Sequence, residues 1–286
     1  MISDITLGQF FPGYSPIHKL DPRTKILLAL AFIVAVFVAN NPLSLLVVTL
    51  LSLVLVFISR ISLSVVIKGL KPIIFILIFT ALLNVFLTGG TGEPLVSFWV
   101  INIYTEGIIR AVFMGVRVLV LIIGTSILLT YTTSPISLTD GLESLLSPLK
   151  AIKVPVHTFA MMMSIALRFI PTLVEETEKI MNAQKSRGAD FTSGGLVKRA
   201  KALVPLLVPL FVSSFKRAEE LATAMECRCY RGDKNRTKLV KLEYRARDII
   251  SMLAFAVLIG AVISMSIIPY NFESPGIIYD ILFYRV

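Results

Sequence analysis

The hydrophobic positions of this chain fall into long, nearly unbroken runs. Runs of this length predict membrane-spanning helices, because about 20 residues of α-helix cross the hydrocarbon core of a bilayer. No strand-like alternation of any length is found. We therefore predict an all-α integral membrane protein with five spans, or six if the apolar segment 157–174 also enters the membrane. The five expected spans are Pro22–Ala39, Leu43–Ile58, Pro72–Leu87, Gly107–Tyr131 and Ile249–Ile268.

Short segments of polar residues followed by proline precede the first two spans. Asp21-Pro22 is typical of a helix start, with aspartate as N-cap and proline at the first helical position, where its missing N–H costs nothing. Asn40-Asn41-Pro42 predicts a tight turn into the second span. The third and fourth spans are joined by residues 88–106, which contain no Lys or Arg.

A long, more polar insert separates the fourth span from the last one. It begins with a short amphipathic piece around Leu138–Leu146. Two long helices are then expected, Val156–Arg187, as one helix or two bent at Pro171, and Leu196–Arg231. This pattern divides the chain into an N-terminal membrane domain (1–131), an insert of coupling helices (132–248) and a last span with its tail (249–286).

Composition supports a membrane protein and places the charge in the insert. Of the 286 residues, 56% are hydrophobic and 16% charged, and the mean hydropathy is +0.83. The segment Lys179–Arg247 holds sixteen of the 28 Lys and Arg residues and only six acids, so it accounts for the whole net charge of +10. Such a segment suits a protein partner or anionic lipid. Nucleic acid is the least favoured partner, because no aromatic interleaving or nucleic-acid motif accompanies the charge.

The distribution of cations between loops predicts the orientation. Basic residues precede the first span and lie between spans two and three, whereas residues 88–106 have none. We expect a multi-pass protein of the prokaryotic cytoplasmic membrane. Its N-terminus and the insert would be cytoplasmic and its C-terminus external.

Two Arg-Gly pairs are the candidate functional site. Ser186-Arg187-Gly188 and Tyr230-Arg231-Gly232 each end a predicted long helix, 44 residues apart. A single pair is explained by capping alone, because glycine permits a left-handed C-cap and a cation complements the helix dipole. Two such pairs on neighbouring helices favour docking onto a soluble partner, since the planar guanidinium binds carboxylates in a bidentate manner.

Arg110 and Arg117 lie seven residues apart on one face of the fourth span. Charges inside a membrane are costly and usually face protein or water. The two arginines could bind an anionic substrate, but no acid accompanies them in that span. We favour structural pairing for the two arginines, and Arg110 could instead extend to the membrane interface.

Other candidate chemistry is weak. Cys227 and Cys229 could begin a metal site, but a tetrahedral site needs about four ligands and no histidine is near; buried helix positions are the simpler interpretation. His18 and His157 have no neighbours at ligand spacing and are expected to be structural. The acids Glu175, Glu176 and Glu178 are expected to form a solvated helix face.

Motifs of bond-making chemistry are missing from the sequence. It has no phosphate-binding Gly-x-x-x-x-Gly-Lys-Ser/Thr loop, no zinc-protease pattern and no Ser/His/Asp arrangement. The interrupted helix pairs of many secondary transporters are also missing. We therefore expect no enzyme, no cofactor and no metal.

The chain resembles a known family over essentially its whole length, in the order of its spans, its long insert and its final span, and two short segments carry the resemblance most specifically. The arginine pairs resemble the two short arginine motifs that end the coupling helices of the transmembrane T component of energy-coupling factor (ECF) transporters. The usual first residue of those motifs is alanine, from which Ser186 and Tyr230 depart. The segment before the first span is the second similarity, and it reads Gly8-Gln9-Phe10, Pro12-Gly13-Tyr14-Ser15-Pro16-Ile17-His18-Lys19 and Leu20-Asp21-Pro22-Arg23-Thr24-Lys25.

This resemblance implies a non-catalytic scaffold. Two ABC-type ATPases would bind the coupling helices, with Arg187 and Arg231 entering grooves in them. A substrate-binding membrane S component would pack against the apolar surface of the helices and release a vitamin or metal ion. Two alternatives remain: a secondary transporter with a regulatory basic insert and a substrate site at Arg110 and Arg117, and, less favoured, a membrane-bound enzyme.

Overall fold

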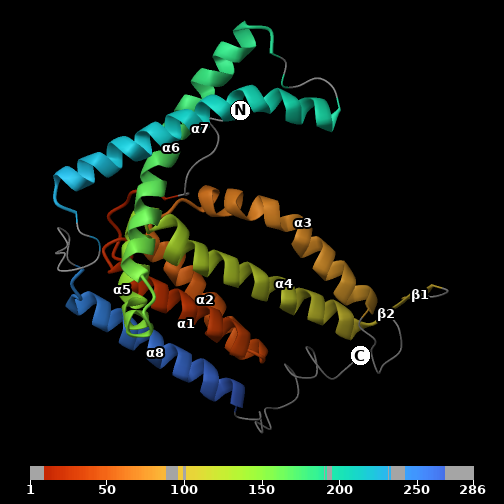
Figure 1. Ribbon diagram of the computed structural model, residues 1–286. Helices are drawn as coiled ribbons and strands as arrows, with labels where there is room; N and C mark the ends of the chain where they lie inside the picture. Colours follow the sequence, from red (N-terminus) through yellow and green to blue (C-terminus); the bar gives the residue numbers. More distant parts are fainter. Residues whose placement is uncertain are drawn as a thin grey trace, which may run out of the picture. The chain divides into compact units, whose positions relative to one another are not determined.

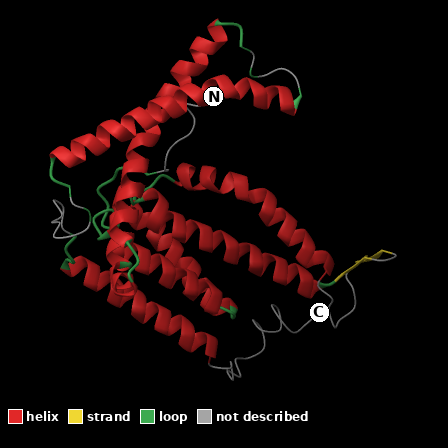
Figure 2. Cartoon of the chain, viewed as in Figure 1, coloured by secondary structure: helices red, strands yellow, loops and turns green. Residues whose placement is uncertain are grey.

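The chain folds almost entirely into helices (Figures 1 and 2). The computed structural model describes residues 10–87, 96–98, 101–189, 191, 195–230, 232 and 242–267. The long helices are α1 Pro22–Val38, α2 Pro42–Ser59, α3 Leu63–Leu87, α4 Thr105–Thr125, α5 Pro135–Leu145, α6 Val156–Ser186, α7 Leu196–Cys227 and α8 Ala246–Ile267. The all-α fold class is confirmed.

One small hairpin interrupts the helical order. Strand β1, Val96–Phe98, pairs antiparallel with β2, Ile101–Ile103, with Val96 opposite Ile103. It lies in the connection between α3 and α4, where the sequence pattern predicted no strand. Each strand is only three residues long, too short for alternation to be read from sequence.

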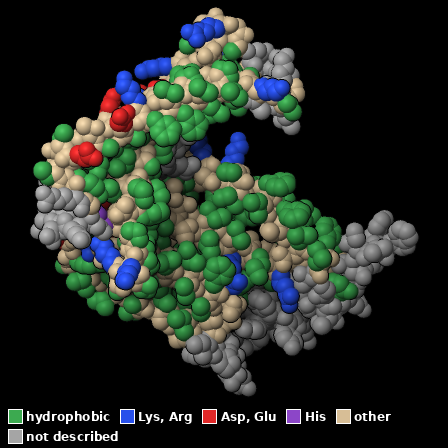
Figure 3. All heavy atoms as spheres, viewed as in Figure 1, with side chains coloured by type: hydrophobic (Ala, Val, Ile, Leu, Met, Phe, Trp, Pro, Cys, Tyr) green, Lys and Arg blue, Asp and Glu red, His purple; other side chains and the backbone are tan. Residues whose placement is uncertain are grey.

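Within the described residues, five helices are long and apolar enough to cross a membrane, but they are not the predicted five. They comprise α2, α3, α8, the segment Gly107–Tyr131 and also α6. Helix α1, at 17 residues, is slightly shorter than these. Large apolar side chains are exposed along α3, including Phe75 (78%) and Leu87 (75%), and hydrophobic side chains cover much of the surface in Figure 3. Exposed apolar surface on this scale is typical of lipid or partner contact.

Two helix boundaries differ from the prediction. Helix α3 begins at Leu63, nine residues before the expected start, and contains Pro72 in its interior. Lys68 and Lys71 therefore lie on the helix and not in a loop. Helix α7 ends at Cys227, four residues before the expected end at Arg231.

The chain forms two compact units. The bundle unit comprises Phe10–Ser134 and Glu243–Val286, and the insert unit comprises Pro135–Leu242 together with Met1–Gln9. In the bundle unit, α4 packs against α1, α2 and α3, while α8 packs against α1 and α2. In the insert unit, α6 packs against α5 and α7.

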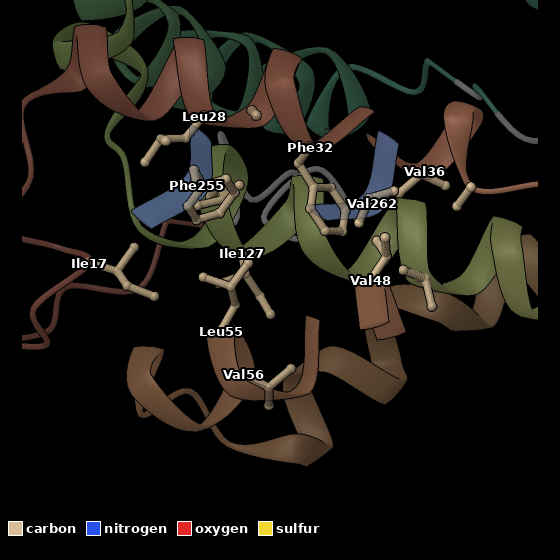
Figure 4. Close-up of a cluster of buried hydrophobic side chains, with 14 of the residues drawn as sticks. Ile17, Leu28, Phe32, Val36, Val48, Leu55, Val56, Ile127, Phe255 and Val262 are labelled. Atoms are coloured by element: carbon tan, nitrogen blue, oxygen red, sulfur yellow. The ribbon is translucent and has the colours of Figure 1, made fainter. Parts of the chain in front are cut away.

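The apolar core of the bundle unit is centred on Phe32 (Figure 4). Phe32 of α1 is fully buried and lies among side chains of α2, α8 and the π-helical turn Ser126–Tyr131 that continues α4. Gly124 allows this packing, because a Cβ at that position would overlap the Phe32 ring. A substitution here would force the two helices apart.

A buried polar cluster ties together the three segments at the start of α1, the start of α8 and the end of the π-helical turn. The backbone N–H of Asp21 donates to Asp248 Oδ1 at 2.8 Å, and Asp248 Oδ2 accepts from the Arg245 N–H at 2.9 Å. Lys25 Nζ donates to the Thr132 carbonyl at 2.8 Å. Asp248 and Lys25 are 1% and 2% exposed. The motif Leu-Asp-Pro-Arg-x-Lys therefore has a structural explanation as the N-cap and anchor of α1.

We predict that Asp248→Ala lowers the free energy of unfolding by at least about 2 kcal/mol, because two backbone N–H groups lose their acceptor in a buried site. The measurement is the thermal unfolding midpoint of the purified chain in detergent. Glu243→Ala is the matched control, since Glu243 is exposed in the same connection. Equal midpoints for the two variants would contradict the prediction.

Candidate docking site

Helices α6 and α7 are joined by a polar contact within the insert unit. Glu176 of α6 accepts a hydrogen bond from the Ser213 hydroxyl of α7 and forms an ion pair with Arg217 at 2.7 Å. Their side chains are only partly exposed, 20% for Glu176 and 35% for Arg217. The sequence placed Glu176 on a solvated face. In the structure, Glu176 instead lies at the crossing of the two helices. Glu175 is exposed, as expected.

The crossing lies at the same distance from the C-terminal ends of the two helices. Arg187 follows Glu176 by eleven residues, and Arg228 follows Arg217 by eleven residues. At 1.5 Å per residue, each arginine lies about 16 Å along its helix from the ion pair. The two helix ends are therefore equivalent in their distance from the crossing.

Helix α6 ends in a Schellman cap that positions Arg187. The Ala189 N–H donates to the Gln184 carbonyl and the Gly188 N–H to the Lys185 carbonyl, both at 3.0 Å. Gly188 adopts φ +87°, the left-handed conformation that this cap requires. Arg187 is the C-cap residue, and its side chain is exposed. Ser186, the last helical residue, donates its hydroxyl to the Asn182 carbonyl at 3.1 Å.

Helix α7 ends in the same cap, three residues before the predicted Arg-Gly pair. The Tyr230 N–H donates to the Met225 carbonyl at 3.0 Å, and the Cys229 N–H to the Glu226 carbonyl at 2.8 Å. Cys229 takes the left-handed position, with φ +58°, and Arg228 is the exposed C-cap residue. Arg228 is thus the structural counterpart of Arg187.

The predicted second pair lies beyond this cap. Tyr230 takes part in the cap through its backbone, Gly232 has φ +77°, and Arg231 lies outside the described residues. Sequence reasoning missed Arg228 because it used glycine as the marker of the helix end. A comparison of Ser186-Arg187-Gly188 with Cys227-Arg228-Cys229, each a small residue, arginine and a small residue, would have found it.

An apolar groove runs between the two helices. Its volume is about 250 Å³. Met225 lines it from α7, near the Arg228 cap, and Phe169 and Leu173 line it from α6, before Glu176 in the sequence. Helix α7 also presents an exposed apolar stripe at helical spacing, formed by Val204 (52%), Val208 (58%), Phe211 (60%) and Phe215 (74%).

Arg117 has a structural role in the bundle unit. Its Nη2 donates to the Ala39 carbonyl at the end of α1 at 2.6 Å, and its guanidinium stacks over Phe113 at 4.9 Å. A cation at this position complements the C-terminal dipole of α1. Arg110, by contrast, is exposed. This geometry supports the structural interpretation and offers little to the alternative of a substrate-binding arginine pair.

The histidines are engaged in local contacts, as expected. His157 Nδ1 contacts Glu143 Oε1 at 2.8 Å in a buried pair of the insert unit. His18 contacts Ser15 and the Phe11 carbonyl. Cys227 and Cys229 are exposed, which corrects the expectation of buried helix positions. Among the described residues, no group of three His, Cys, Asp or Glu residues is arranged to hold a metal ion.

This arrangement defines a multi-pass helical membrane protein whose insert presents two equivalent arginine-capped helix ends. A family model described as cobalt transport protein, CbiQ, matches residues 13–239. The chain is 54% identical over 259 residues to the energy-coupling factor transporter transmembrane protein EcfT of Clostridium kluyveri, covering 91% of this chain and 96% of the relative. Proteins of the same name from Acidaminococcus fermentans and Bacillus subtilis are 51% identical over 263 residues and 48% over 262; each match covers 91% of this chain, and 97% and 98% of the relatives.

The chain therefore belongs to the CbiQ/EcfT family of energy-coupling factor transporter transmembrane proteins. It is a multi-pass protein of the cell membrane and a component of an ECF transporter. The names of its relatives describe a transmembrane component, which agrees with a non-catalytic subunit.

We predict opposite effects of substitutions at the two left-handed cap positions. Gly188→Ala should destabilise the end of α6 by about 1–2 kcal/mol, because alanine disfavours positive φ, and Cys229→Gly should stabilise the end of α7 by a similar amount. Amide hydrogen exchange of the last turns measures both effects. Gly195→Ala is the control, since Gly195 has φ −69° and open space around it. A loss of protection for Gly195→Ala equal to that for Gly188→Ala would contradict this account.

Proposed function

We propose that the chain is the energy-coupling subunit that links two ABC-type ATPases to a substrate-binding membrane S component. It carries out no bond-making chemistry itself. Movement of the ATPases would be transmitted through α6 and α7 and would cause the S component to release its substrate, a vitamin or a metal ion. The observation that carries this proposal is the pair of equivalent arginine caps on two crossed helices.

The geometry of the helix ends supports docking to two similar ATPases. Each arginine extends from a cap with two backbone hydrogen bonds, so its Cα is fixed relative to its helix. Equal distances of about 16 Å from the crossing give the two ends equal lever arms. The Glu176–Arg217 ion pair lies where the helices would pivot. We assign Arg187 to one ATPase and, by its equivalent position, Arg228 to the other; Arg231, the residue predicted from sequence, is three positions further along.

The apolar surface of α7 supports an S component as the membrane partner. The side chains of the stripe formed by Val204, Val208, Phe211 and Phe215 are 52–74% exposed in the described part of the chain. A continuous apolar stripe of this kind needs lipid or a second hydrophobic protein against it. A partner packed here would move with α7.

The distribution of cations supports an N-terminus on the cytoplasmic side. Lys19 and Arg60 are both exposed and lie in connections before α1 and between α2 and α3. Lys and Arg near the ends of spans are retained on the cytoplasmic side. The ATPases would then meet the insert unit in the cytosol.

We predict that Arg187→Ala and Arg228→Ala each weaken binding of the ATPase pair, and that the double variant is worse. A lost charge-assisted contact in a desolvated interface costs about 2–5 kcal/mol. The measurement is co-purification of the ATPases with the tagged chain in detergent, followed by ATP-dependent uptake in liposomes. Arg231→Ala in parallel decides between the two assignments of the second contact.

Arg110→Ala is the control for this series, because Arg110 is an exposed arginine outside the insert unit. It should leave assembly and uptake intact. Full complex yield and full uptake in the Arg187→Ala/Arg228→Ala double variant would contradict docking through the helix caps. Uptake by the purified chain without any ATPase would instead favour a secondary transporter.

We predict separately that Phe211→Ser combined with Phe215→Ser reduces retention of the S component while the ATPases remain bound. The reason is the loss of exposed apolar area that the partner would cover, at about 25 cal/mol per Å². Pull-down with quantification of each subunit measures the two interactions at once. Val257→Ser in α8 is the control, because Val257 is 74% exposed in the bundle unit. Unchanged retention of the S component would rule out this stripe as its docking surface.

A further inference from the structure

A cavity of about 370 Å³ lies in the bundle unit, between the N-terminal loop and the turn from α2 to α3. Its lining contains one arginine, three serines and a histidine, and it contains no Asp or Glu. The lining residues are Phe11, Pro12, Gly13, Tyr14, Ser15, His18, Ser59, Arg60, Ile61, Ser62 and Val65. A cavity lined by an arginine and several hydroxyl groups, with no acid among its described lining residues, is suited to an anion.

His18 is a fixed part of the wall. Its Nε2 must carry the proton, because it contacts the Phe11 carbonyl, which only accepts, at 2.9 Å. Nδ1 then accepts from the Ser15 hydroxyl at 2.7 Å. Burial lowers the pKa of His18, which keeps this ring neutral. Gly13 packs directly on the imidazole, since a Cβ there would approach His18 Cε1 to 2.9 Å. The cation of the cavity is therefore Arg60.

Arg60 is placed for an external ligand. It adopts φ +56° between the two helices, and its N–H is bonded to the Phe57 carbonyl at 3.3 Å. Within the described part of the chain, no ion pair involves its guanidinium, and the residue is exposed. Ser62 and the first turn of α3, which begins at Leu63, add a hydroxyl and the positive end of a helix dipole. Guanidinium, hydroxyl and helix N-terminus together favour a phosphate group.

The surroundings of the cavity favour a lipid phosphate over a free one. Phe57 (75% exposed), Leu63 (59%) and Ile67 (64%) lie on the two helices beside Arg60. These side chains belong to the ends of two apolar helices long enough to cross the membrane. A ligand here would meet a polar cavity at one side and exposed apolar surface at the other, as the headgroup and acyl chains of a phospholipid require. Tyr14, 92% exposed on the rim, is typical of the membrane interface.

We propose that this cavity binds the headgroup of an anionic phospholipid, with the Arg60 guanidinium on the phosphate and the acyl chains along α2 and α3. The site is independent of the proposed ATPase docking. A bound lipid would hold the N-terminal loop against the α2–α3 turn. The loop is joined to the bundle through the Phe11 N–H, which donates to the Tyr131 carbonyl at 3.0 Å.

The test is native mass spectrometry of the full chain, released from detergent, titrated with phosphatidylglycerol, phosphatidylcholine or inorganic phosphate. We expect phosphatidylglycerol adducts that survive mild activation, and about fivefold weaker binding for Arg60→Gln, the factor that corresponds to about 1 kcal/mol per cation near a membrane surface. Arg110→Gln, which removes an exposed arginine elsewhere in the same unit, should bind as the unaltered chain does. Phosphate alone should not compete.

Three results would overturn the proposal. Equal losses of phosphatidylglycerol binding in Arg60→Gln and Arg110→Gln would mean that the lipid responds only to the overall positive charge of the protein. Phosphatidylcholine contains the same phosphate, but its choline cation cancels the charge, so equal binding of this lipid would mean that the net negative charge of the headgroup is not recognised. Full competition by inorganic phosphate would make the ligand a soluble anion. A photoactivatable phosphatidylglycerol added to the unaltered chain gives a second reading that does not depend on a variant folding. It should label peptides containing Tyr14 or Ser62, and labelling spread evenly over all exposed apolar helices would also reject the site.

Discussion

The bundle unit depends on the buried polar cluster formed by Asp21, Lys25, Thr132 and Asp248. Asp21 and Asp248 are 227 residues apart in the sequence, yet one backbone N–H and one carboxylate join them at 2.8 Å. Charged groups this deeply buried are tolerated only when their hydrogen bonds are satisfied. The chain enters the insert unit at Pro135, three residues after Thr132, and ends it at Leu242, three residues before Arg245, which Asp248 binds. The bundle-side ends of both connections to the insert are therefore anchored by the same cluster.

The two long helices of the insert unit are held together by interactions of a different kind. They are joined at their crossing by a partly exposed ion pair and a serine hydroxyl. Such contacts are worth about 1 kcal/mol or less when they are exposed. Their ends, in contrast, are held by two backbone hydrogen bonds each. Helix ends fixed in this way are what the proposed docking to ATPases requires.

Three polar side chains of the bundle unit differ in the partners that they contact. Arg117 satisfies the end of α1 from within α4, and His18 closes the N-terminal loop on itself. Arg60 differs from these two because its turn leaves the guanidinium exposed beside a cavity. Arg117 and His18 each contact a backbone carbonyl of the protein and have structural roles. Arg60 has an exposed guanidinium, which is why we assign the ligand to it.

Sequence alone determined the helical class, the approximate spans and the nature of the first cap, because long apolar runs and Asp-Pro act through local physics. It also identified Arg187, where a glycine coincides with the helix end. The second cap was decided by tertiary structure: Cys229 adopts the left-handed conformation that sequence reasoning reserved for glycine, which moved the helix end from Arg231 to Cys227. The roles of Glu176, Asp248 and Arg117 likewise depend on partners 37 to 227 residues away, and no local pattern encodes such distances.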